Sequence, residues 1–336
     1  MIVGNVLGAG LGMNVARQIG LRAGVPERVP AFTVNMMCGS GMQAVILAAQ
    51  AIRAGEARAV LCGGVESMSN APHLLQRAPH ARRVGSDGRA DSLQCDGLVD
   101  PLLGEHMALT AERLAQRYRI ERLEQDAFAE RSHRLHAEAL AAGRFAAELV
   151  AIDGCERDEH PRPGLTLEKL ATLKPAFSAS GSITPGNASG VNDGAAMLVL
   201  ADAALARERG WPALATIHAW SAVGCDPATM GLGPVHAIRR LRELHGVDAR
   251  ECDHVELNEA FAAQALACLR ELELEPRSVN PDGGAIALGH PIGASGARLL
   301  VHLAQRTAAG ATRRSLAALC VGGGMGLAMA LHPTAA

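Results

Sequence analysis

The sequence GSGMQAVILAAQAIRAGEARAVLCGG, from Gly39 to Gly64, contains the most informative pattern of the chain. Small residues typical of a turn come first, and strong helix formers follow from Met42 to Arg53. After Gly55, the apolar residues from Ala59 to Gly64 predict a buried strand. The pattern therefore predicts a helix that leads into a parallel strand, as in a right-handed β-α-β unit.

The segment from Gly293 to Gly324, GASGARLLVHLAQRTAAGATRRSLAALCVGGG, repeats this plan. Its predicted helix runs from Ala297 to Ala308, and its predicted strand from Leu316 to Gly324. Both copies start with a Ser-Gly pair and end with an apolar strand that runs into cysteine and glycines. Two such units predict a duplicated α/β core, although two alanine-rich units can also resemble each other by chance.

The stretch between the copies, from about Asn70 to Ser189, is richer in Arg, His, Glu and Pro, and we interpret it as an insertion. Apolar residues at three- and four-residue steps predict helices from Met107 to Tyr118 and from Arg122 to Gly143. The charged, proline-broken segment from Gly154 to Gly164 predicts a surface loop. Residues from Gly186 to Leu200 return to the core pattern and predict a buried strand.

Composition excludes several classes of function. A chain of 336 residues with 49% hydrophobic and 20% charged residues is typical of a globular protein of about two domains. A net charge of −2 and few aromatic residues argue against nucleic acid as a partner. There is no long uninterrupted apolar run and no basic N-terminal leader, so we expect a cytoplasmic protein without membrane association. The 8 cysteines lack metal-site spacing, which predicts reduced thiols and no metal.

Cys38 lies in NMMCGSGMQAV, where an apolar run ends and a helix of the first copy begins. The first turn of a helix favours an anion, so this position is expected to stabilise a thiolate and suits a nucleophile. The segment alone also fits a small buried apolar residue.

Two further segments contain polar residues next to predicted helices. ELNEAFAAQ, from Glu256 to Gln264, places Asn258 and Glu259 in the first turn of a helix, where the amide either orients a water molecule or caps the helix. NPDGGAIALGHPIGASGAR places His290 in a tight loop between a Gly-rich apolar strand and the second helix. There an imidazole can act as a base at neutral pH, and the alternative is a solvent-exposed loop histidine.

LCVGGGMG, from Leu319 to Gly326, places Cys320 at the end of a buried strand. The glycines that follow allow backbone N–H groups to approach a ligand closely. A second thiol at this position can serve as proton donor and acceptor.

Together these segments resemble the thiolases, a family of acyl-CoA acyltransferases that condense and cleave thioesters, and the resemblance runs from Met1 to about Leu331. The motifs that carry it follow one another in order along the chain: GNVLGAGLGMNVARQ, VNMMCGSGMQA, CGGVESMSNAP, HMALTAERLA, ERLEQDAFAERSH, KPAFSASGSITPGNASGVNDGAA, MGLGPVHAI, ELNEAFAAQ, GGAIALGHPIGASGAR and LCVGGGMG. The resemblance implies an α/β fold with duplicated α/β/α/β/α layers, two similar halves and an inserted loop domain.

The same resemblance implies a domain division. Residues 1–69 with 190–212 match the N-terminal half, residues 70–189 match the loop domain that covers coenzyme A, and residues 213–336 match the C-terminal half.

By matching motif positions, Cys38 resembles the nucleophile that takes the acyl group as a thioester, and His290 resembles the base that activates it. Cys320 resembles the acid/base that moves the proton of the C2 carbon of the second acyl-CoA. Asn258, through a water, and His290 match an oxyanion hole for the enolate. The backbone N–H groups of Cys38 and Gly322 match a second hole over the acyl-enzyme carbonyl.

For the substrate, the resemblance implies that His106, Phe177, Ser189 and Phe261 line the tunnel for the pantetheine arm of coenzyme A, and that Arg162 lies near the nucleotide phosphates. The substrates are then coenzyme A and its thioesters, with no separate cofactor and no metal.

The pair His106-Met107 resembles that of the acetoacetyl-CoA type of thiolase, in which the methionine narrows the acyl pocket, and this favours short, unbranched acyl groups. The family also implies a homo-oligomer, a dimer or tetramer, and places its tetramer loop in the Arg- and His-rich stretch from Leu75 to Arg89.

Two departures from the family pattern stand out. The family ordinarily has about fifty residues before the part that matches Gly4, including a strand in the middle of a five-stranded sheet, so we expect a missing or misassigned start and an exposed sheet edge. In SITPGNASG, Pro185 replaces the usual alanine and adds stiffness only.

The function that the resemblance implies is the reversible condensation of two acetyl-CoA molecules into acetoacetyl-CoA and coenzyme A through an acyl-cysteine intermediate. One alternative is a longer-chain 3-ketoacyl-CoA thiolase of fatty-acid β-oxidation. Another is a truncated acyl-CoA-binding paralogue without activity. A ketoacyl synthase of the same broad fold fits less well, because that group has a second histidine where this chain has Asn258.

Overall fold

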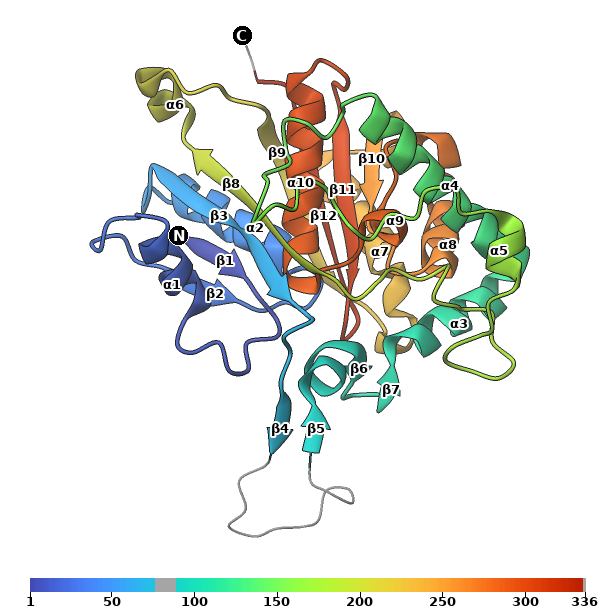
Figure 1. Ribbon diagram of the computed structural model, residues 1–336. Helices are drawn as coiled ribbons and strands as arrows, with labels where there is room; N and C mark the ends of the chain where they lie inside the picture. The colour runs from blue at the N-terminus through green and yellow to red at the C-terminus, as the bar shows by residue number, and fades with distance from the viewer. Residues whose placement is uncertain (76–88, 335–336) are drawn as a thin grey trace.

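The computed structural model describes residues 1–75 and 89–334, and two four-stranded sheets form its centre (Figure 1). The N-terminal sheet has the order β2 (Phe32–Val34), β1 (Ile2–Gly4), β3 (Ala59–Ser67) and β8 (Asp193–Ala201). β1 pairs in parallel with β2 and β3, whereas β8 is antiparallel to β3. The crossover from β2 through a helix to β3 is thus the parallel unit that the repeat predicts.

The C-terminal sheet has the order β10 (His254–Leu257), β11 (Ser315–Val321), β12 (Met325–His332) and β9 (Thr216–Gly224). β10 and β11 are parallel, and β12 is antiparallel to both of its neighbours. Both sheets therefore combine a parallel unit with an antiparallel edge strand.

Helices lie between the two sheets and outside them. α2 (Ser40–Arg53) and α10 (Ile292–Ala308) share one apolar core with both sheets, which includes Ile2, Met42, Leu299, Leu319 and Leu327. On the outer face of the C-terminal sheet, α7 (Gly233–His245) and α8 (Ala262–Leu272) form a second core with the alternate residues of β11. α1 (Val15–Arg22) packs on the N-terminal sheet. The predicted α/β fold with α/β/α/β/α layers is confirmed.

The first turns of α2 and α10 touch at the two repeated Ser-Gly pairs. A Cβ atom added to Gly41 would lie 2.7 Å from the backbone nitrogen of Ala297, and one added to Gly296 would lie 2.6 Å from that of Met42. Real Cβ atoms do not approach backbone atoms so closely. The glycines therefore allow the two helices to meet backbone to backbone.

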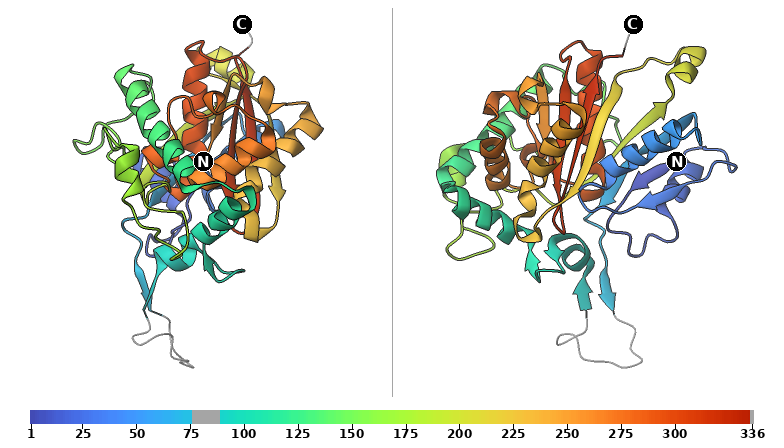
Figure 2. Two further views of the ribbon diagram at one scale, coloured as in Figure 1. Left: turned by 90° about the vertical axis from the view of Figure 1, so that its right-hand side faces the viewer. Right: turned by 180° about the vertical axis from the view of Figure 1, so that it is seen from behind.

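Between β3 and β8 the chain leaves the N-terminal sheet. It forms α3 (Met107–Tyr118), α4 (Arg122–Ala141) and α5 (Leu167–Ala171), which lie beside the C-terminal half in Figure 1. Two small ladders precede them: β4 (His73–Leu75) with β5 (Arg89–Asp91), and β6 (Val99–Asp100) with β7 (Glu105–His106). The β4–β5 ladder projects from the body in both views of Figure 2. Residues 76–88 of the predicted tetramer loop lie outside the described residues.

Helix starts are where the sequence predictions differ from the structure. α3 has the predicted bounds, and α4 begins at the predicted Arg122. α10, however, begins at Ile292 rather than Ala297, because the small residues before Ala297 are helical and serve packing instead of a turn. Asn258 and Glu259 precede α8 rather than forming its first turn.

Two predicted strands also need correction. The Gly-rich segment before His290 contains the short helix α9 (Ala285–Leu288) instead of a strand. The strand β8, expected to be buried, lies at the edge of its sheet and is only partly covered.

The prediction of an exposed sheet edge beside β1 was wrong. Ile2 lies opposite Cys62 and Gly4 opposite Gly64, so β3 pairs directly with β1. β2 covers the other side of β1. The four strands thus form one continuous sheet, and the backbone of β1 is paired on both sides.

None of the helices in residues 1–75 and 89–334 has both the length and the apolar character needed to cross a bilayer.

Replacing Gly41 with alanine should destabilise the fold, because its Cβ would meet the backbone of α10 at 2.7 Å. We expect Gly41→Ala to lower the free energy of unfolding by about 1–3 kcal/mol. The measurement is urea unfolding followed by circular dichroism. Gly224→Ala is the control, because a Cβ added there would lie 4.0 Å from its nearest neighbour, the Gly324 carbonyl oxygen. We expect its free energy of unfolding to change by less than about 1 kcal/mol. Equal stabilities for the two variants would contradict the packing argument.

Candidate active site

Cys38 lies in the turn between β2 and α2, and this turn is held in an unusual shape. Met37 has φ 46°, in the left-handed region that non-glycine residues seldom adopt. Ser40 stabilises the turn, because its Oγ accepts from the Met36 N–H at 2.8 Å and donates to the Met37 carbonyl at 2.7 Å. The conformation directs Cys38 toward the C-terminal half, where the Gly322 N–H lies close enough to lower the pKa of its thiol.

Burial controls the charge of the Cys38 thiol. It raises the pKa of Cys38 to about 11, although the N–H groups of Gly322 and of Cys38 itself lower it, and the nearby Glu66 carboxylate raises it further. The expectation that the helix start stabilises a thiolate was therefore wrong in its net effect. Loss of hydration raises the pKa of Cys38 more than the N–H groups at the helix start lower it. Cys38 rests as a thiol and needs a base.

Cys320 lies on β11 opposite Gly326 of β12, and it is 1% exposed. Burial, followed by the charge of a Cys38 thiolate, raises the pKa of Cys320 well above the ordinary thiol value. The two thiols therefore lie close enough to affect each other. Phe261 and Met107 pack in the same apolar cluster as Cys320.

His290 follows α9, and its ring orientation is set by Ser295 of α10. The imidazole Nδ1 lies 2.6 Å from Ser295 Oγ, which itself donates to the Pro291 carbonyl at 3.0 Å. Because the serine proton is used on Pro291, Oγ accepts from Nδ1–H, and this assigns the proton of the neutral ring to Nδ1. Nε2 is left as the acceptor, as a general base requires.

The Nε2 atom of His290 is buried and has no hydrogen-bond partner among the described residues. Burial, with a smaller effect of Arg298, lowers the pKa of His290 to about 4. The ring is thus neutral at pH 7 and offers a free lone pair.

Asn258 follows β10, and its backbone N–H donates to the Ala318 carbonyl at 2.9 Å. Its side chain is fully buried, yet neither Oδ1 nor Nδ2 has a partner within the part of the chain that the structure describes. Buried polar atoms are almost always paired. The unpaired atoms of Asn258, like that of His290, therefore each indicate a place for a polar ligand or a water.

Gly322 completes this group beside the thiols. A Cβ added there would lie 3.6 Å from both Met107 Sδ and Met37 Cγ, so the two methionines flank it. A pocket of about 520 Å³ opens on the Met37 side, and its lining includes Asn35, Met37, Asp96, Asp100 and Gly322.

The residues predicted to bind coenzyme A fall into two pairs and one separate residue. The rings of His106 and Phe177 stack with centroids 4.5 Å apart. Ser189 donates from both its N–H and its Oγ to the Ala260 carbonyl, next to Phe261. Arg162 is exposed, and its backbone N–H donates to His133 Nδ1 at 3.2 Å.

Glu66 is a site residue that the sequence analysis missed. Its buried carboxylate accepts from the N–H groups of Val6 and Leu7, both at 3.0 Å, and from that of Gly293 at 2.9 Å. It thereby ties the N-terminal strand to the start of α10. The available signal was a single carboxylate within the apolar run AVLCGGVES.

Known proteins resemble the chain over nearly its whole length. The family model described as "Thiolase, N-terminal domain" matches residues 1–204, and "Thiolase, C-terminal domain" matches residues 211–333. Acetyl-CoA acetyltransferase of Pseudomonas aeruginosa is 48% identical over 340 residues, which cover 98% of this chain and 86% of that protein. The enzyme of the same name from Cupriavidus necator is 46% identical over 341 residues, which cover 99% of this chain and 87% of that protein.

Solved structures are similar over nearly the whole chain. Human mitochondrial 3-ketoacyl-CoA thiolase in complex with CoA matches with a TM-score of 0.95 and 41% identity, covering 99% of this chain and 86% of that one. The acetyl-CoA acetyltransferase of Bacillus anthracis matches with a TM-score of 0.93 and 41% identity, with the same coverage.

Ser295→Ala should impair the base without removing it, because Nδ1 loses its acceptor and the ring can adopt the other tautomer. We expect Cys38 to react with iodoacetamide about 10-fold more slowly at pH 7. Mass spectrometry of the peptide that contains Cys38 measures the rate. Ser221→Ala removes another buried serine, whose Oγ donates to the Ala237 carbonyl, and should leave the rate unchanged. A wild-type rate for Ser295→Ala would contradict the proposed tautomer.

Acid should destabilise the protein through His290. The folded-state pKa of about 4 lies below the ordinary value of 6.5, so between these values the unfolded chain binds a proton that the folded chain does not. We expect His290 to reduce the free energy of unfolding by up to about 3 kcal/mol as pH falls through this window. The stability difference between wild type and His290→Asn, measured in urea at pH 7 and pH 4, should change by that amount. A constant difference would refute the burial of a neutral ring.

Proposed function

The chain belongs to the thiolase family, and we propose that it transfers an acetyl group between coenzyme A thioesters, joining two acetyl-CoA molecules into acetoacetyl-CoA and coenzyme A or catalysing the reverse thiolysis. The observation that carries this proposal is a pair of neighbouring thiols, the partly buried Cys38 and the buried Cys320, in a chain where buried polar atoms of His290 and Asn258 have no partner among the described residues. One thiol can form a thioester while the other moves a proton.

In the first half-reaction, His290 Nε2 removes the proton of Cys38, and Sγ attacks the carbonyl carbon of acetyl-CoA. The N–H groups of Cys38 and Gly322 stabilise the oxyanion. The bond from carbon to the coenzyme A sulfur then breaks, and the leaving thiolate takes the proton of Cys320. The products are acetyl-Cys38, free coenzyme A, an imidazolium at His290 and a thiolate at Cys320.

In the second half-reaction, the Cys320 thiolate removes a proton from C2 of a second acetyl-CoA. Its raised pKa makes it a strong enough base for this step. The imidazolium of His290 and a water on Asn258 stabilise the enolate oxygen. The carbanion attacks acetyl-Cys38, the thioester bond breaks, and Cys38 recovers its proton from His290.

The position of Met107 favours short acyl groups as substrates. It packs in one cluster with Cys320 and Phe261 and flanks Gly322, so its side chain takes up space directly beside the thiols. We propose that His106, Phe177, Ser189 and Phe261 contact the pantetheine arm and that the exposed Arg162 meets the phosphates. Solved thiolases with coenzyme A bound, from human mitochondria and from Ascaris suum, support coenzyme A as the ligand.

Assembly into a dimer or tetramer stays a prediction. The N-terminal sheet ends at β2, and Phe32 on this strand is 48% exposed, which suits contact with a second copy.

Substituting each thiol should stop a different half-reaction. Cys38→Ala should lower the rate of acetoacetyl-CoA thiolysis at least about 1000-fold, because no thioester can form. Cys320→Ala should lose thiolysis to a similar extent yet still acetylate Cys38 when mixed with acetyl-CoA, as mass spectrometry would detect. The assay follows the absorbance of acetoacetyl-CoA at its enolate band.

Cys252→Ala is the matched control, because this buried thiol lies in a separate core cluster and should leave thiolysis unchanged. Wild-type thiolysis by Cys38→Ala would overturn the assignment of the nucleophile. Faster turnover of a C8 than of the C4 substrate by the wild-type protein would instead favour a longer-chain 3-ketoacyl-CoA thiolase.

A further inference from the structure

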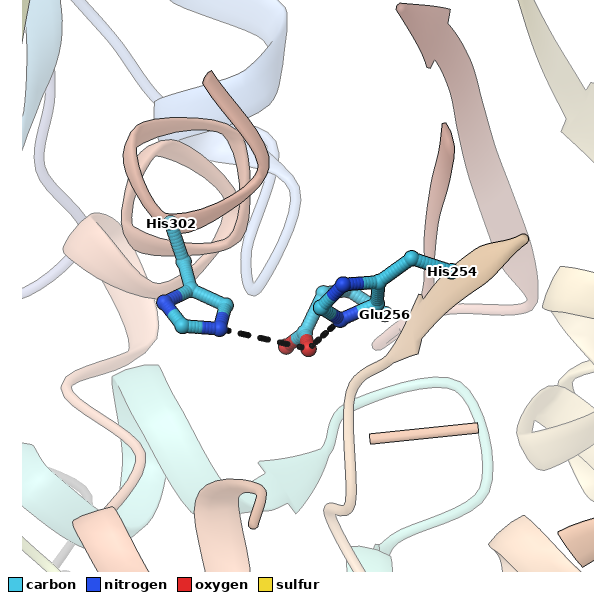
Figure 3. Close-up of side chains that lie close together, drawn as sticks. All are labelled: His254, Glu256 and His302. Atoms are coloured by element: carbon cyan, nitrogen blue, oxygen red, sulfur yellow. Dashed lines mark hydrogen bonds and ion pairs between the residues drawn. The ribbon is translucent and has the colours of Figure 1, made fainter. Parts of the chain in front are cut away.

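A buried group of charged side chains lies behind the site and joins parts of the chain that are distant in sequence. His302 of α10 is 1% exposed and Glu256 of β10 is fully buried, and Figure 3 shows them facing each other with His254. Asp282, from the loop before α9, and Glu148, from the segment after α4, contact the same imidazole.

The geometry assigns a positive charge to His302. Its Nδ1 lies 2.8 Å from Glu148 Oε1, and its Nε2 lies 3.1 Å from Asp282 Oδ2. A carboxylate only accepts, so both ring nitrogens must donate, and only the imidazolium has two N–H groups. Burial opposes this charge, but the hydrogen bonds to Asp282 and Glu148 outweigh it and raise the pKa of His302 to about 9.

Three arginines also contact these carboxylates. Arg298 lies 3.1 Å from Glu256, while Arg144 and Arg306 lie 2.5 Å and 3.2 Å from Asp282. His254 Nε2 also contacts Glu256, at 2.8 Å. The positively charged members, Arg144, Arg298, Arg306 and His302, thus face the carboxylates of Glu148, Glu256 and Asp282.

The nitrogen and oxygen atoms of His254, Glu256 and His302 lie within 4.8 Å of one another, which is also a spacing that a divalent cation could use. The four cationic groups already exceed the three carboxylates by one charge, and a divalent cation that displaced the His302 proton would raise this excess to two. An excess charge in a buried place is strongly unfavourable. The cluster is therefore an ion-pair network in its own right.

The network connects the backbone segments that position two proposed catalytic residues, Asn258 and His290. Glu256 precedes Asn258 by two positions on the same backbone segment, and α10 begins two residues after His290. The loop of Asp282 also contains Asn280, whose side chain bonds to both the N–H and the carbonyl of Leu257 at 2.8 Å. A displacement at His302 would thus be transmitted along a rigid helix of about 15 Å to the loop of His290.

We propose that His302 is a positioning residue for catalysis: by bridging Glu148 and Asp282, it holds α10 and the His290 loop in register with the segment that carries Asn258. The expected effect on thiolysis rests on the thiolase function proposed above. The expected effect on Cys38 alkylation does not, because it requires only that His290 lies beside the thiol.

The test compares His302→Gln, which removes the charge, with His302→Lys, which can restore a cation between the two carboxylates. Thr307→Val is the matched control, since it removes a buried hydroxyl bond to the Leu303 carbonyl on the same helix. Two rates are measured in each protein: alkylation of Cys38 by iodoacetamide, resolved by mass spectrometry, and thiolysis of acetoacetyl-CoA, resolved into kcat and KM.

We expect His302→Gln to slow Cys38 alkylation at pH 7 and to lower kcat by about 10- to 100-fold with KM within about twofold, because the base is displaced while the coenzyme A site is kept. His302→Lys should recover most of both rates, and Thr307→Val should match wild type. The ratio of wild-type to His302→Gln alkylation rates should fall toward one as pH rises through about 9, where wild-type His302 loses its proton.

A folded His302→Gln protein with wild-type alkylation and kcat at every pH would overturn the inference, as would a His302→Lys protein no faster than His302→Gln. If His302→Gln does not fold, Glu148→Gln replaces it. Loss of this carboxylate should lower the pH at which the rate of Cys38 alkylation changes with loss of the His302 proton. The same pH dependence as in wild type would overturn the inference. A wild-type protein without thiolysis would refute the proposed function but leave the alkylation result decisive for His302.

Discussion

The backbone contact between α2 and α10 is the constraint on which the site depends. Cys38 lies two residues before the start of α2, and His290 lies two residues before the start of α10. The two helix starts must therefore meet for the two side chains to act together. Gly41 and Gly296 make that approach possible, since a side chain on either would collide with the opposite backbone. The serines before these glycines also act alike, because Ser40 bonds the turn of Cys38 and Ser295 bonds the turn of His290.

Burial sets the resting charges of the site. It raises the pKa of both thiols and lowers that of His290, so all three groups are neutral at pH 7. An ion pair forms only during turnover, in our proposal, when His290 holds the Cys38 proton and Cys320 has given its own away. In this proposal, protons pass only between these three side chains and the substrates. By contrast, the charged groups of the His302 network have partners of opposite charge at pH 7 whether or not substrate is bound.

The sequence predicted the architecture where local patterns determine it and failed where glycine serves packing. The periodicity of Met107–Tyr118 gave the bounds of α3, because that helix has one apolar face. The run before Ala297 contains glycines that usually mark a turn, yet they belong to α10, because the opposing helix requires their small size. The motifs predicted both thiols, the base and Asn258 as site residues, and Ser295 lies in the same motif as His290. Glu66 and Asp282 act through contacts between segments distant in sequence, which no local pattern encodes.

A thiol that rests in its neutral form also resists oxidation, because peroxides and disulfides react with thiolates. With a pKa of about 11, Cys38 exposes very little thiolate between turnovers. In the proposed mechanism, Cys38 becomes a strong nucleophile when His290 takes its proton. Keeping Cys38 as a thiol in the resting site thus limits its oxidation between turnovers.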